Sequence, residues 1–126
     1  GAPLKALQLI EDKSLELQQS WRAALLDLAA GRSEPLKAAA EVGEPQAAAF
    51  LRWLYGWLLQ LLRAGMVPDG GELAALAQGL PRHALDRYIG EVQENLRRLE
   101  LNAKAQLVLE AVLIRWRALV ALGQRS

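Results

Sequence analysis

The sequence predicts an all-α protein that folds as a single compact bundle of about six to seven helices. The composition favours helix over strand, because the chain has no threonine and leucine and alanine supply most of its apolar residues. Glycine and proline are also spaced so that they divide the chain into segments of helical length. The 126 residues suffice for one hydrophobic core, so we expect one domain.

The first 30 residues are expected to form two helices. A short apolar pattern over residues 4–10 predicts one or two helical turns. Ser14 is a suitable N-cap for a second helix, which is expected to run to about Ala30 and to stop at Gly31.

Two Glu-Pro pairs mark the starts of the next two helices. Pro35 suits the first turn of a short third helix, which Gly43 closes. Pro45 begins a fourth helix, which is expected to end before Gly65.

The fourth helix contains an apolar run over residues 47–62 that includes Arg52 and Gln60. A membrane span needs about 20 apolar residues, and a charged side chain at its centre costs several kcal/mol. We therefore expect a buried central helix and no membrane insertion. Trp53 and Trp57 are one helical turn apart and are expected to anchor the core.

The second half of the chain follows the same pattern. Residues 66–71 read Met-Val-Pro-Asp-Gly-Gly and predict a loop, and a short fifth helix is expected over residues 72–78. A sixth helix is expected over residues 81–99. Asn102 is expected to cap a seventh helix over residues 103–122.

The overall charge and the absence of cysteine exclude several kinds of function. Fifteen Lys and Arg residues against 14 Asp and Glu give a net charge of +1, which provides no basic footprint for nucleic acid. The chain has no cysteine, so it can form neither disulfides nor thiolate metal ligands. With no signal-peptide pattern at the start, the expected location is cytoplasmic.

The residue types that usually carry catalysis are sparse. His83 is the only histidine, and no second ligand of the usual kind lies near it in the sequence. Gly70 and Gly71 precede a predicted helix, but Glu72 follows with the wrong charge for phosphate binding. None of the four serines has a nucleophile motif around it. We expect no catalytic, cofactor-binding or metal site.

One enzymatic alternative remains open at this point. This alternative is a small all-helical enzyme that holds a carboxylate substrate with buried arginines such as Arg22, Arg52 or Arg87. Such a site requires two or more arginines that converge on one cavity beside an acid.

The last predicted helix is apolar on two sides. A helix of this kind is either central to its own bundle or shared with a neighbouring subunit, and the sequence leaves both alternatives open. One apolar stripe consists of Leu107, Ala111, Ile114 and Ala118, and the other consists of Leu109, Val112, Leu113, Trp116 and Val120.

Residues 76–88 and 96–116 together resemble the C-terminal domain of bacterial DNA polymerase III clamp-loader subunits, and the delta-prime type above all. Members end with a helix, a break that contains asparagine, and a second helix rich in leucine. The matching residues here are Asn102, Leu109, Leu113 and Arg115, with Val112 in place of a leucine.

The start of the chain carries an independent resemblance. Residues 1–7, Gly-Ala-Pro-Leu-Lys-Ala-Leu, are similar to the Gly-Ser-x-x-x-Ala-Leu element that closes the AAA+ lid domain. Leu4 stands where the ATPase members carry their sensor-2 arginine. The resemblance thus implies that residues 1–12 are the end of the lid and that residues 13–126 form the helical collar domain.

The resemblance implies a non-catalytic C-terminal fragment of a subunit of the DNA polymerase III holoenzyme. Such a collar domain associates with those of the gamma/tau and delta subunits in a five-membered ring that loads the sliding clamp during DNA replication. It implies no ATP site, no cofactor, no small-molecule substrate and no direct nucleic-acid contact. The gamma/tau collar domain is the alternative within the family, and Leu4 favours delta-prime.

The subunit contacts are expected on the last helix. Tryptophan and arginine are favoured at the centres of interfaces, and both occur near its end. The residues predicted to contact a neighbouring subunit are Leu109, Leu113, Trp116, Arg117 and Val120.

Overall fold

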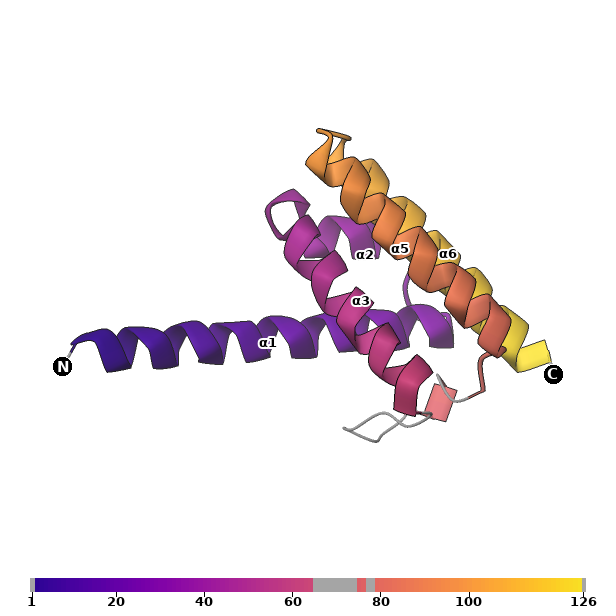
Figure 1. Ribbon diagram of the computed structural model, residues 1–126, viewed down its shortest axis with the longest axis horizontal. Helices are drawn as coiled ribbons and strands as arrows, with labels where there is room; N and C mark the ends of the chain where they lie inside the picture. Colours follow the sequence, from indigo (N-terminus) through magenta and orange to yellow (C-terminus); the bar gives the residue numbers. More distant parts are fainter. Residues whose placement is uncertain (1, 65–74, 77–78, 126) are drawn as a thin grey trace.

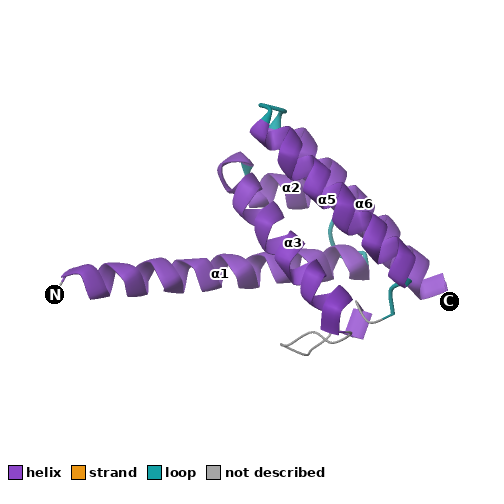
Figure 2. Ribbon diagram, viewed as in Figure 1, coloured by secondary structure: helices purple, strands orange, loops and turns teal. Residues whose placement is uncertain are grey.

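The computed structural model describes residues 2–64, 75–76 and 79–125, and every regular element in this part is helical (Figures 1 and 2). The all-α prediction is confirmed, although five α-helices in the described part are slightly fewer than the six to seven expected. The helix expected over residues 72–78 falls largely outside the described residues. The elements are α1 (Ala2–Ala30), α2 (Pro35–Val42), the 3-10 turn η1 (Glu44–Gln46), α3 (Ala47–Ala64), α5 (Arg82–Glu100) and α6 (Ala105–Arg125).

Helix α1 is continuous, so the expected break before Ser14 is wrong. No glycine or proline lies between Pro3 and Gly31, and a single serine inside a helix costs only a fraction of a kcal/mol relative to alanine. Gly31 ends the helix as predicted, with a φ of 78°. The boundary expected between the lid remnant and the collar domain, at residues 12–13, falls inside α1.

Helices α2 and α3 begin and end close to the predicted residues. Pro35 is the first residue of α2, and Gly43, with a φ of 82°, follows its end. Helix α3 buries seven of its described side chains, among them Leu51, Leu54 and Leu58, and exposes Arg52 and Gln60 as predicted. Among the described residues, no helix has both the length and the apolar character needed to cross a membrane.

Helices α5 and α6 lie side by side and antiparallel, joined by a tight turn (Figure 1). Helix α3 packs against α5, and α2 packs against α6. The C-terminal half of α1 contacts α6, while its N-terminal half extends beyond the other helices (Figure 1). Helix α6 is therefore packed by helices from both halves of the chain.

An aromatic cluster joins four of the helices in the core. Trp116 of α6 is fully buried, and its ring centroid lies 6.2 Å from that of Trp57 in α3 and 6.2 Å from that of Tyr88 in α5. The Trp116 Nε1 donates a hydrogen bond of 3.0 Å to the backbone oxygen of Leu25 in α1. Trp57 is buried and Trp53 partly buried, so the prediction that they anchor the core is confirmed.

The turn between α5 and α6 corrects the expected role of Asn102. Its φ is 68°, and its backbone N–H bonds to the oxygen of Leu99 at 3.1 Å. The N–H of Ala103 bonds to the oxygen of Arg98 at 2.9 Å, which completes a Schellman motif. Asn102 therefore closes α5, and α6 begins three residues later, at Ala105. Asparagine suits this position because it tolerates the left-handed conformation.

Replacing Asn102 tests this assignment. Asn102→Ala is expected to lower the free energy of unfolding by about 1 kcal/mol, because alanine adopts the left-handed region at a cost. Asn102→Gly is expected to be neutral or slightly stabilising, since glycine adopts it freely. Urea unfolding followed by circular dichroism measures both. An alanine variant as stable as the glycine variant would contradict the left-handed turn.

Candidate interaction surface on helix α6

One side of α6 forms a large part of the core. Leu109, Leu113 and Trp116 are each 0% exposed, and Val120 is 2% exposed. These side chains pack inside the chain itself, so they cannot contact a neighbouring subunit in this fold. The prediction that these four residues form a subunit interface is therefore wrong. Arg117, the fifth residue of that set, is exposed.

The opposite side of α6 carries the second apolar stripe, which faces solvent. Its large members are Leu107 and Ile114, whose exposed fractions are 60% and 50%. The spacing alternates between four and three residues, which is the repeat by which helices pack in coiled coils. We call this stripe, extended by the exposed Ala121, the outer seam, and it consists of Leu107, Ala111, Ile114, Ala118 and Ala121.

Two charged residues flank one edge of the outer seam. Glu110 and Arg117 lie two helical turns apart and precede Ala111 and Ala118. The Glu110 carboxylate accepts a hydrogen bond of 2.9 Å from Gln106 Nε2. The Arg117 side chain is exposed and has no ion pair or side-chain hydrogen bond among the residues that the structure describes. This edge therefore offers one acidic and one basic group to a partner.

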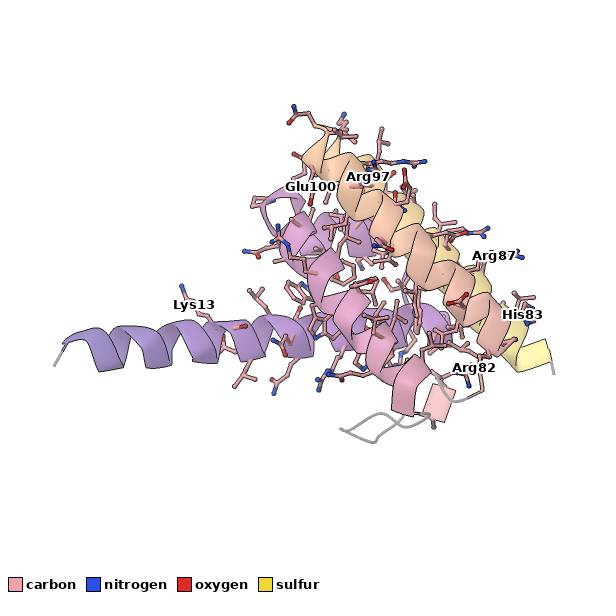
Figure 3. The ribbon with its side chains drawn as sticks, viewed as in Figure 1. Lys13, Arg82, His83, Arg87, Arg97 and Glu100 are labelled. Atoms are coloured by element: carbon pink, nitrogen blue, oxygen red, sulfur yellow. The ribbon has the colours of Figure 1, made fainter. Side chains whose placement is uncertain are left out.

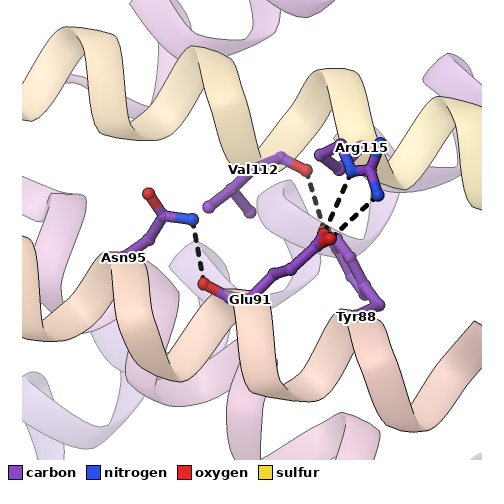
Figure 4. Close-up of polar contacts among 5 residues, drawn as sticks. All are labelled: Tyr88, Glu91, Asn95, Val112 and Arg115. Carbon is purple, nitrogen blue, oxygen red and sulfur yellow. Dashed lines mark hydrogen bonds and ion pairs between the residues drawn. The ribbon is translucent and has the colours of Figure 1, made fainter.

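The other edge of the outer seam is fixed to α5 (Figure 4). Arg115 donates to both carboxylate oxygens of Glu91, from Nε at 3.1 Å and from Nη2 at 2.8 Å. The buried Tyr88 hydroxyl of α5 donates a hydrogen bond of 2.9 Å to the backbone oxygen of Val112. These bonds set the rotation of α6 against α5, so the outer seam is presented on a fixed helix face.

Burial raises the pKa of Tyr88 well above its usual value of 10.0, and the nearby Glu91 carboxylate adds to the rise. In the unfolded chain this tyrosine ionises near pH 10, whereas in the folded chain it stays protonated. The folded state then binds more protons, so the free energy of unfolding falls as the pH rises above about 10.

Tyr88→Phe is therefore expected to weaken this alkaline loss of stability, because phenylalanine has no proton to release. At neutral pH the same change is expected to cost about 1 kcal/mol for the lost hydrogen bond. Urea unfolding between pH 8 and pH 11 (about one unit beyond the usual tyrosine pKa) measures both effects, with Tyr55→Phe as the matched control. Equal alkaline slopes for the Tyr88→Phe variant and the unsubstituted chain would contradict this account.

Two of the three arginines considered for a carboxylate pocket do share a groove. Arg22 of α1 and Arg52 of α3 line it together with Trp53 and Trp57, whose rings stack with centroids 6.2 Å apart. Among the described side chains, no Asp or Glu lines this groove, and Arg87 lies in a different pocket. The part of the groove that the structure describes therefore holds no acid of the kind that the enzymatic alternative requires.

Arg87 and His83 line a small pocket between α5 and α6. Figure 3 shows both side chains on the outer side of α5. The pocket holds about 150 Å³, which is below the roughly 300–1,000 Å³ of most ligand sites. His83 is exposed, and among the described residues no group of three or more His, Cys, Asp or Glu side chains is placed to hold a metal ion.

Comparison with known proteins gives no match: no protein-family model, no curated protein and no solved structure is significantly similar to this chain. The fold and the surface therefore define only a class, an all-α domain with an exposed coiled-coil-like seam on its last helix. The sequence predicts the stripe of Leu107, Ala111, Ile114 and Ala118, but the subunit contacts were predicted on the other, buried stripe. Glu110, Arg117 and Arg115 lie between the two stripes and border both of them, so the sequence of this helix carries no signal that tells the stripes apart.

Proposed function

We propose that this chain is an assembly domain that binds a helix of a neighbouring subunit through the outer seam of α6. The observation that carries the proposal is the exposure of Leu107 and Ile114, at 60% and 50%, on a helix whose other side is fully packed. Large apolar side chains that line up on one exposed face favour burial against a partner. Their four-three spacing favours a helix as that partner.

The particular assembly that we propose is the collar of a bacterial DNA polymerase III clamp loader, with this chain as the collar domain of a delta-prime subunit. The resemblance of residues 1–7 and 96–116 to that family supports this choice, and Leu4 favours delta-prime over gamma/tau. The partners are then the collar domains of the gamma/tau and delta subunits. In this role the domain is non-catalytic, cytoplasmic and free of cofactors, and it supports clamp loading in DNA replication.

Co-purification tests this function directly. The chain is expected to co-elute with gamma/tau and delta subunits from the same bacterium when the three are co-expressed. Circular dichroism and size-exclusion chromatography of the chain alone establish that it is folded. A folded chain that elutes apart from those subunits would contradict the proposed function.

A further inference from the structure

The outer seam is complementary to itself when two α6 helices run antiparallel. We propose that two copies of this chain pair through this seam when other subunits are absent, so that the homodimer covers the face used for assembly. The proposal deepens the proposed function and rests on it only for the statement that this face binds other subunits. The pairing itself rests on the sizes and the charges of the seam residues.

The first argument is the alternation of large and small side chains. In an antiparallel coiled coil, Ala111 can lie opposite Ile114 of the second copy. In the same register Leu107 lies opposite Ala118 of the second copy. By twofold symmetry each pair occurs twice, so each of these four layers sets one large side chain against one alanine.

A parallel pairing lacks this property. Each seam residue would lie opposite the same residue of the second copy. The layers of Leu107 and of Ile114 would then each hold two large side chains and be crowded. The alanine layers between them would hold two methyl groups and leave gaps. Interiors without voids are more stable, which favours the antiparallel arrangement.

The second argument is the charge along the edge of the seam. Glu110 directly precedes Ala111, and Arg117 directly precedes Ala118. In an antiparallel pair of helices, these flanking positions of one copy face the same kind of position in the other copy. In the register set by the large and small layers, Glu110 lies beside Arg117 of the second copy. Symmetry gives two such pairs. On the other edge, the Arg115 charge is already paired with Glu91, at 2.8 Å.

The extent of the seam sets the expected strength of the dimer. The seam covers two heptads of one helix, and interfaces that bury less than about 1,200 Å² are weak or transient. We expect a dissociation constant in the micromolar range. A subunit that contacts more of the domain can therefore displace the second copy.

A charge swap tests the pairing by sedimentation equilibrium of the chain alone. Glu110→Arg and Arg117→Glu, made singly, each replace two attractive pairs by two repulsive pairs and are expected to weaken dimerisation by about tenfold. The double variant restores opposite charges and is expected to recover the original affinity. A double variant that dimerises no better than the singles, or a chain that stays monomeric at millimolar concentration (above any micromolar dissociation constant), would overturn the proposal.

Disulfide trapping tests the direction of the helices. The chain has no cysteine, so introduced thiols report only on their own positions. Ala111→Cys mixed with Ile114→Cys is expected to cross-link faster than either variant alone. Preferential cross-linking of Ile114→Cys to itself would show a parallel pair and overturn the proposal. A chain that dimerises but fails to bind gamma/tau and delta would leave this inference standing and contradict only the proposed function.

Discussion

Replacing Trp116 by alanine is expected to lower the free energy of unfolding by about 3–5 kcal/mol. The indole is fully buried at the junction of α1, α3, α5 and α6, so alanine leaves a cavity that these helices cannot easily close. The change also removes the hydrogen bond from Nε1 to the oxygen of Leu25. Since domains of this kind are stable by about 5–15 kcal/mol, the variant is expected to be marginally folded. Urea unfolding followed by circular dichroism measures the loss.

Two further variants separate the causes of that loss. Trp116→Phe keeps a buried ring but loses the hydrogen bond and part of the volume, and it is expected to cost less than the alanine variant. Leu122→Ala is the surface control, because Leu122 is 49% exposed; its expected effect is within about 0.5 kcal/mol. A loss below about 1 kcal/mol for Trp116→Ala would contradict the central position of this side chain.

Glutamate substitutions at two adjacent residues of α6 are expected to have opposite consequences. Leu113→Glu places a carboxylate where the side chain is 0% exposed, so it is expected to unfold the domain. Ile114→Glu adds a charge to the outer seam, where the side chain is 50% exposed. The monomer is then expected to keep its stability within about 0.5 kcal/mol.

The same Ile114→Glu change is expected to abolish binding of a second copy through the outer seam, because the carboxylate would have to lose its bound water at the centre of that interface. Thermal unfolding followed by circular dichroism measures stability, and size-exclusion chromatography measures association. If Leu113→Glu folded normally while Ile114→Glu unfolded, the assignment of the two faces of α6 would be reversed.

Most helix ends were predictable because single residues specify them. Pro35 and Gly43 bound α2, and Gly31 ends α1, each for a backbone reason that the sequence displays. The break before Ser14 was predicted wrongly because a capping residue is also tolerated inside a helix. Asn102 was predicted as the N-cap of the last helix but closes α5, since asparagine suits both an N-cap and a left-handed C-terminal turn.

The site was only half predictable. Sequence periodicity revealed both apolar stripes of α6, but it could not say which one faces the core. Which stripe faces the core depends on contacts between residues far apart in the sequence. One example is the hydrogen bond from Trp116 to the backbone oxygen of Leu25, 91 positions earlier in the chain. The hydrogen bond from Tyr88 to Val112 adds a second such constraint. Packing of α6 against α1, α2, α3 and α5 leaves the side chains of Leu107 and Ile114 exposed.

The most direct test of the outer seam as an assembly surface is a binding titration against the complex of gamma/tau and delta subunits. The unsubstituted chain and the Leu107→Glu/Ile114→Glu double variant are compared after circular dichroism shows that both are folded. We expect the double variant to bind at least about 100-fold more weakly, the equivalent of about 2.7 kcal/mol. Equal affinities of the two folded chains would contradict the account.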